Sequence, residues 1–74
     1  MSGNAPIKKF RIGFVTANVW KNDVDGGKSF YNVTLERSYK NSAGEWEAGN
    51  SFNHDELLNA AALLQKAETF ISAQ

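Results

Sequence analysis

The 74-residue chain has no cysteine, one proline, one histidine and no net charge at pH 7. Without cysteine, neither a disulfide nor a thiolate metal site can stabilise the fold. A domain of this length buries only about 60% of the surface that its unfolded chain exposes, so its core is marginal. We therefore expect one domain that gains further stability by associating with a second copy of itself.

Long apolar segments are also missing. The longest apolar run, residues 60–64, is far too short to span a bilayer. The first nine residues contain no apolar stretch of the kind that a signal peptide needs. These absences predict a cytoplasmic location. We expect residues 1–9 to form a disordered basic tail and residues 10–74 to form the domain.

The sequence has few features of a catalytic site. His54 stands at the start of a predicted helix, where a solvated surface side chain is the simpler interpretation. The carboxylates are scattered over predicted strands and turns instead of being paired in apolar surroundings. Gly27, Lys28 and Ser29 do not complete a phosphate-binding loop, because Asn22 stands where that motif has its first glycine. We expect no enzyme activity, no cofactor and no metal ion.

One strong helix signal is present near the C-terminus. Asn53 precedes Glu56 by three residues, which is the spacing of a capping box, and apolar residues then recur at helical spacing up to Ile71. The helix is apolar on more than one side, which predicts that one side covers a sheet and another meets a partner chain. The predicted dimer interface comprises Leu57, Ala60, Ala61, Leu64, Ala67, Phe70 and Ile71.

The preceding residues favour strands. Residues 10–20 are rich in aromatic and β-branched residues, but Gly13 interrupts their alternation. The apolar residues stand at even positions up to Phe14 and at odd positions from Val15 to Val19. Either a bulge at Gly13 lets both of these groups face the core, or the run splits into two short strands. Residues 29–40 alternate cleanly, and a turn at 41–44 leads into a strand at 45–52. This order predicts an α+β fold: a curved antiparallel meander of three to four strands, covered on one face by the helix.

Aromatic residues near the strand ends lie beside basic residues. Rings next to lysine and arginine suit unpaired bases, which stack on the rings while phosphates meet the cations. We expect Trp20, Lys28 and Tyr39 to share the uncovered face of the sheet. Ordinary core or hairpin packing is the alternative, and for Trp20 and Tyr39 both interpretations remain open. The candidate nucleic-acid-binding residues are Arg11, Trp20, Lys21, Lys28, Arg37, Tyr39, Lys40 and Trp46.

Several short motifs, taken in order, are similar to those of one protein family. They are Phe-Arg-Ile-Gly at 10–13, Gly-Gly-Lys at 26–28, the aromatic Tyr39, Ala-Gly-Glu-Trp-Glu-Ala-Gly at 43–49, Ser-Phe at 51–52, and Asp-Glu-Leu-Leu at 55–58. Over residues 10–71 the chain resembles the positive-cofactor family of single-stranded-DNA-binding transcriptional coactivators, in a small bacterial or phage form.

This resemblance implies a β-β-β-β-α fold that dimerises through its helices and binds single strands without sequence preference. It also implies a nucleoid-associated protein of transcription, replication or repair, with a further protein partner from one of these processes. Trp20, Lys28 and Tyr39 match the family's binding positions. Phe14, Thr16 and Asn50 stand where the family has basic residues, which should lower the affinity more than it alters the fold. The natural ligand can be DNA or RNA. The alternative function is a dimeric protein-interaction module that binds no nucleic acid.

Overall fold

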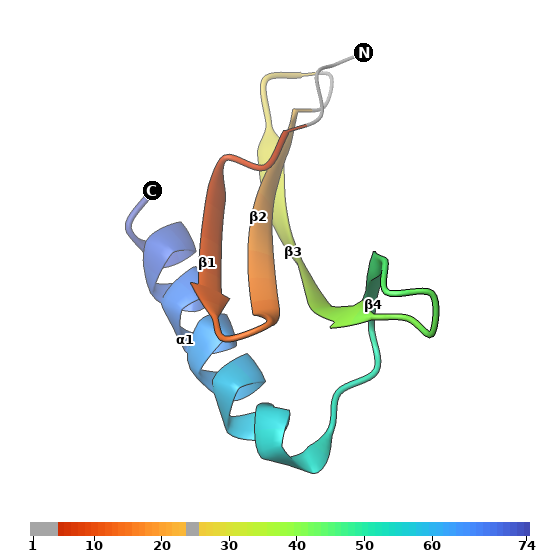
Figure 1. Ribbon diagram of the computed structural model, residues 1–74. Helices are drawn as coiled ribbons and strands as arrows, with labels where there is room; N and C mark the ends of the chain where they lie inside the picture. The colour runs from red at the N-terminus through yellow and green to blue at the C-terminus, as the bar shows by residue number, and fades with distance from the viewer. Residues whose placement is uncertain (1–4, 24–25) are drawn as a thin grey trace.

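The computed structural model describes residues 5–23 and 26–74, which form one antiparallel sheet followed by a C-terminal helix (Figure 1). This confirms the predicted fold class. The elements are β1 (Lys8–Ile12), β2 (Val15–Asp23), β3 (Ser29–Lys40), β4 (Trp46–Gly49), a 3₁₀ turn (His54–Glu56) and α1 (Leu57–Ser72). The strands lie in sequence order across the sheet. β1 begins within the predicted tail, whose residues 1–4 lie outside the described part of the chain.

Gly13 and Phe14 form a two-residue turn between β1 and β2. Ile12 pairs with Val15 across it, and Gly13 has a φ of 59°. A positive φ at the first of two turn residues is the requirement of a type II′ turn, which glycine meets without a steric penalty. Of the two alternatives for Gly13, the split into two strands is therefore confirmed. Because the chain reverses here, the apolar residues of both strands face the same side of the sheet.

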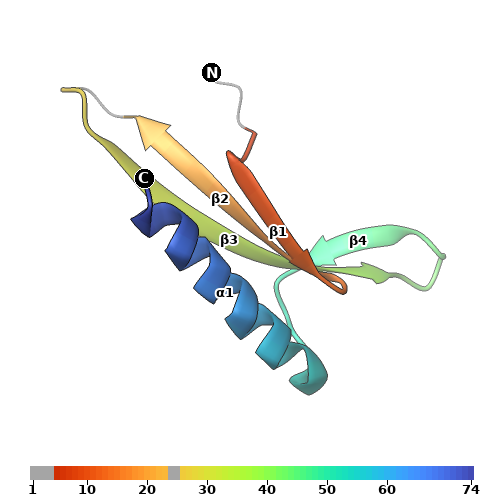
Figure 2. The ribbon, with the colours of Figure 1, turned by 90° about the vertical axis from the view of Figure 1, so that its left-hand side faces the viewer.

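The core lies between α1 and the first two strands, and Figure 2 shows α1 running alongside the sheet. The buried strand residues Val15, Ala17 and Val19 alternate along β2, as one covered face requires. Leu63 fills the centre of the interface, and small residues flank it. The alanines at 17, 60 and 67 allow the helix to lie close to the sheet. The core is therefore shallow, and Leu63 is its largest fully buried side chain.

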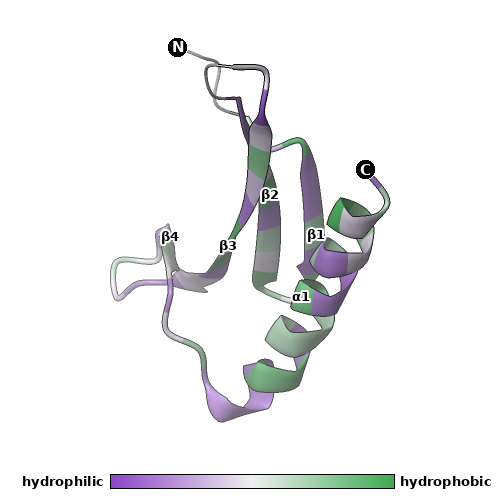
Figure 3. Cartoon of the chain, turned by 180° about the vertical axis from the view of Figure 1, so that it is seen from behind, coloured by the Kyte–Doolittle hydropathy of each residue, from purple (hydrophilic) through white to green (hydrophobic). Residues whose placement is uncertain are grey.

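The residues of the predicted dimer interface lie on two different sides of α1. Ala60 and Ala67 are 8% and 1% exposed because they pack on the sheet of their own chain. Leu57 and Leu64 remain half-exposed, and helical spacing puts them on the flank of α1 that points away from β1 and toward β3. Figure 3 shows apolar residues, drawn green, recurring along α1. One side of the helix thus packs on the sheet, while a separate flank remains half-exposed.

β3 and β4 form a hairpin that projects from the side of the molecule (Figures 1 and 2). β4 pairs only with the last four residues of β3, from Arg37 to Lys40. The strand predicted at 45–52 ends at Gly49 because the chain must leave the sheet there to reach the helix. Phe52 then turns inward and packs against the core cluster.

Candidate nucleic-acid interface

The face of the sheet opposite α1 is not covered by any helix or strand within residues 5–23 and 26–74. Side-chain hydrogen bonds cross it between β2 and β3. Trp20 Nε1 donates to Thr34 Oγ1 at 3.0 Å, and Asn22 Nδ2 donates to Asn32 Oδ1 at 2.8 Å. We call this surface the open face. Strand pairing places on it Lys9, Arg11, Thr16, Asn18, Trp20, Asn22, Phe30, Asn32, Thr34, Glu36, Ser38, Lys40, Trp46 and Ala48.

One end of the open face carries a cluster of two rings and a cation. The rings of Phe14 and Trp46 have centroids 5.7 Å apart and planes inclined at 32°. Lys40 Nζ lies 5.6 Å from the centroid of the Trp46 ring. Phe14 and Trp46 are 51% and 57% exposed. The cluster thus offers aromatic surface beside a positive charge.

The other end carries Trp20 and Phe30. The hydrogen bond from Trp20 to Thr34 holds the indole ring against the sheet, whereas Phe30 is half-exposed. Trp20 pairs with Asn32 and Trp46 pairs with Lys40, so eight residues of β3 separate the two aromatic ends. At about 3.3 Å per residue, this separation is at most about 26 Å. A single short strand of nucleic acid could therefore contact both ends.

The middle of the open face is polar. Asn18 is only 5% exposed, and its Nδ2 donates to Glu36 Oε1 at 3.4 Å. Its Oδ1 has no hydrogen-bond donor within the described residues, and an unpaired acceptor of this kind lowers stability. Lys9 lies beside Asn18 on β1, and Arg11 follows on the same face. The cations thus lie along the border of the face, while the acidic Glu36 lies near its centre.

The structure brings together half of the predicted binding residues. Arg11, Trp20, Lys40 and Trp46 are on the open face, and Lys28 lies in the loop that leads into β3. The helix side of the sheet carries Lys21, Arg37 and Tyr39. The expectation that Trp20 and Tyr39 share a face is wrong. Asn32, the partner of Trp20, precedes Tyr39 by seven residues, and an odd number of steps along a regular strand reverses the face.

Tyr39 and Arg37 make structural contacts at the base of the hairpin. The Tyr39 hydroxyl donates to Glu47 Oε1 at 3.3 Å, and the Arg37 guanidinium carbon lies 5.2 Å from the centroid of the Tyr39 ring. The ring also covers Gly49, where an added Cβ would approach it to 3.2 Å. For Tyr39, these contacts favour hairpin packing over base stacking.

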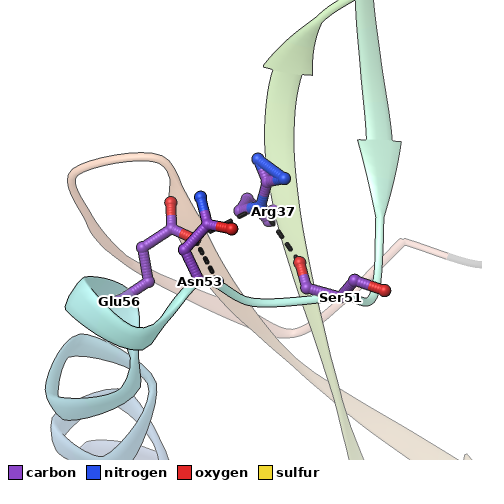
Figure 4. Close-up of polar contacts among 4 residues, drawn as sticks. All are labelled: Arg37, Ser51, Asn53 and Glu56. Atoms are coloured by element: carbon purple, nitrogen blue, oxygen red, sulfur yellow. Dashed lines mark hydrogen bonds and ion pairs between the residues drawn. The ribbon is translucent and has the colours of Figure 1, made fainter.

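Arg37 connects β3 to the start of the helix (Figure 4). Its Nε donates to the Ser51 carbonyl at 3.0 Å and lies 3.2 Å from Glu56 Oε1. The same Glu56 oxygen accepts from the Asn53 backbone N–H at 2.9 Å, which is half of the predicted capping box. One carboxylate thus caps the helix and holds a guanidinium of the sheet. Arg37 therefore fixes the angle at which the chain enters α1.

Phe14, Phe30 and Lys9 contribute rings or charge to this surface but were not among the sequence candidates. Phe14 joins Trp46 through the turn at Gly13, and interpreting Gly13-Phe14 as a type II′ hairpin would have revealed its position. Lys9 was assigned to the tail, although the alternation of Lys9, Arg11 and the following strand would have placed both cations on one face.

The chain matches no family model, no curated protein and no solved structure. The resemblance stated above therefore rests on its sequence motifs. Within the described ranges, no helix has the length and apolar content needed to cross a membrane. The same residues contain no group of three or more histidine or acidic side chains arranged for a metal ion.

Proposed function

We propose that the protein is a homodimer that binds single-stranded nucleic acid, in the first place DNA, on its open face without sequence preference. The observation that supports this best is the cluster of Phe14, Trp46 and Lys40. Two half-exposed rings in mutual contact, with an ammonium group beside them, are poorly suited to water and well suited to an unpaired base and its phosphate. Such a protein would serve transcription, replication or repair.

On the proposed binding surface, the aromatic rings and the cations would contribute to binding in different ways. Stacking on an aromatic ring contributes about 1–3 kcal/mol per base, and every base has a face that can stack. Lys9, Arg11 and Lys40 would attract phosphates without reading sequence. The rings should therefore set most of the affinity, and the cations should set its dependence on salt.

The dimer is supported by apolar surface that a single chain leaves uncovered. Leu57 and Leu64 are half-exposed on the β3 side of α1. Tyr31, Val33 and Leu35 of β3 are only partly buried on the same side of the sheet. A second copy packed on this surface would complete a core that is small for an independent domain.

Sedimentation tests the dimer with a matched pair of variants. Leu64→Asp should give monomers with greatly reduced stability, because it places a carboxylate on the proposed interface. Leu58→Asp should remain dimeric, since Leu58 is 83% exposed on a different side of α1. A wild-type protein that sediments as a stable folded monomer would disprove the dimer.

Fluorescence anisotropy with labelled oligo-dT, alongside the matching duplex, tests nucleic-acid binding. We expect the protein to bind the single strand more tightly than the duplex. Lys9, Arg11, Lys28 and Lys40 could each meet one phosphate. At about −0.7 per contact, the slope of log affinity against log salt should be no steeper than about −3 per protomer. Absence of oligo-dT binding at low salt would contradict the proposal.

A protein-interaction module is the second candidate function. It is favoured by the zero net charge and by the rings of Phe14 and Trp46, because exposed aromatic residues are enriched at protein interfaces. Failure to bind oligo-dT, with the dimer intact, would favour this function. A shallow dependence of partner binding on salt would support it.

A further inference from the structure

The outer edge of β1 is available for pairing. β1 is the first strand of the sheet, and within residues 5–23 and 26–74 it has a neighbour on one side only. Ile12 and Val15 close the two-residue turn as a hydrogen-bonded pair, and bonded pairs alternate along an antiparallel ladder. The backbone N–H and C=O groups of Lys9 and Arg11 therefore point away from β2. An edge of this kind is a template for an added strand.

A groove runs beside this edge, between β1 and α1. It has a volume of about 340 Å³, which is within the range of ligand pockets. Its apolar surface comes from Phe10 and Phe70, whose rings meet edge to face with centroids 6.3 Å apart. Lys8, Gln65, Lys66 and Thr69 complete the lining. A strand added to β1 would place every second side chain in this groove.

The charges around the edge are all positive. Lys9 and Arg11 project on the open face, whereas Lys8 lies on the helix side with its Nζ 5.5 Å from the centroid of the Phe10 ring. None of these residues, nor Lys66, forms an ion pair within the described part of the chain. A second copy of β1 would bring like charges into opposition, which disfavours pairing of two copies at this edge. The edge is instead complementary to an acidic strand.

We propose that an extended segment of a protein partner adds to β1 as a fifth strand of the sheet. Its apolar side chains occupy the groove at Phe10 and Phe70, and its acidic side chains lie opposite Lys9 and Arg11. Backbone hydrogen bonds to the edge and pockets for alternate side chains are the two components of recognition by strand addition. This site goes beyond the nucleic-acid function, since it uses the edge of β1 and a groove on the helix side.

The probe is a synthetic peptide in which valine and isoleucine alternate with glutamate and aspartate. Hydrogen exchange of the full-length protein, followed by NMR, should show the amides of Lys9 and Arg11 becoming protected as the peptide saturates the site. The control peptide has the same apolar residues with lysine at the acidic positions. It should neither bind nor protect these amides, because it repeats the charge of β1.

Two variants at one position separate backbone pairing from charge attraction. Lys9→Ala and Lys9→Pro both remove the ammonium group, but only the second removes the edge N–H, and proline is tolerated on edge strands. We expect Lys9→Pro to bind the acidic peptide at least about fivefold more weakly than Lys9→Ala, which is the order of one lost hydrogen bond. Thermal melts of both variants establish that each is folded.

The outcomes are separable from those of the nucleic-acid test. Equal peptide affinity for folded Lys9→Pro and Lys9→Ala would overturn strand addition. If Lys9→Pro does not fold, the exchange experiment on the wild-type protein decides, and binding without protection of the two amides would overturn it. Protection by oligo-dT but not by the peptide would assign the edge to nucleic acid and overturn the inference. Peptide binding with no oligo-dT binding would support this inference and remove the function proposed above.

Discussion

The two faces of the sheet differ in the burial and in the kind of their side chains. On the helix face, the fully buried side chains of β2 are small or branched, namely Val15, Ala17 and Val19. On the open face, the large rings of Phe14, Phe30 and Trp46 are half-exposed, and polar side chains between them bond to one another across the strands. Three of the largest apolar side chains of the protein are therefore outside the core.

If the open face binds nucleic acid as proposed, this difference separates stability from binding. The helix approaches the sheet closely because Ala17, Ala60 and Ala67 are small, so packing dictates the residue size on that face. Within the described residues, nothing packs on the open face, so packing does not account for its rings. Variants on the helix face should lower stability, and variants on the open face should lower binding.

The largest loss of stability is expected for Leu63→Ala on the helix face. Leu63 is fully buried at the centre of the core, and truncating such a leucine lowers the free energy of unfolding by about 2–5 kcal/mol. Urea denaturation measures this change. Leu58→Ala is the control, because it lies on the same helix but is largely exposed and should cost less than about 0.5 kcal/mol. Equal effects of the two variants would show that the helix is oriented differently.

Trp46 and Tyr39 test whether the two faces differ in binding. Trp46→Ala should weaken oligo-dT binding about tenfold, or near 1.4 kcal/mol, while the melting temperature changes little. Tyr39→Ala should leave binding unchanged but destabilise the hairpin, because its ring packs on Gly49 and Arg37. Anisotropy and thermal melts on the same samples give both quantities. A loss of binding for Tyr39→Ala alone would contradict the assignment of faces.

The connection between sheet and helix is tested at Glu56. Glu56→Ala removes the acceptor for the Asn53 N–H and the partner of Arg37, which should cost about 1 kcal/mol of stability. Glu56→Gln keeps an acceptor for the cap and should cost less than half as much. Denaturation curves compare the two variants. Equal losses would mean that the charge contributes most of the effect and the cap little.

The smallest expected effect is that of one cation on the open face. Lys40→Ala should reduce the slope of log affinity against log salt by about 0.7, with little change in stability. Lys66→Ala, on the helix side, should not alter the slope. Anisotropy over a range of salt concentrations measures both. An unchanged slope for Lys40→Ala would mean that the Lys40 ammonium only supports the Trp46 ring.

Local patterns predicted much of the fold. The bounds of β3, Ser29–Lys40, agree with the clean alternation of the sequence there, and Asn53 and Glu56 mark the start of the helix as their spacing predicts. Both signals depend on residues that are close in the chain. The division of the helix into a core side and an exposed flank was predicted only in part, because Ala60 and Ala67 could face either a sheet or a partner.

The candidate site was harder to predict because its members come from different strands. Trp46 and Phe14 are distant in the sequence, and their rings meet only because β2 pairs with β3, β3 pairs with β4, and the chain turns at Gly13. Tyr39 looked equivalent to Trp20 because each is an aromatic residue followed by a lysine. Their faces depend on the register between β2 and β3, which adjacent residues do not encode.

By itself, the sequence determined which segments form strands and helix, where the helix is capped, and that the core is small. These properties follow from local conformational preferences and from the period of apolar residues. Only the tertiary structure decided which rings share a face, that Arg37 holds the helix start, and that β1 lies beside an apolar groove at the sheet edge. Those relations depend on strand register and helix placement, which are set by contacts between residues distant in the sequence.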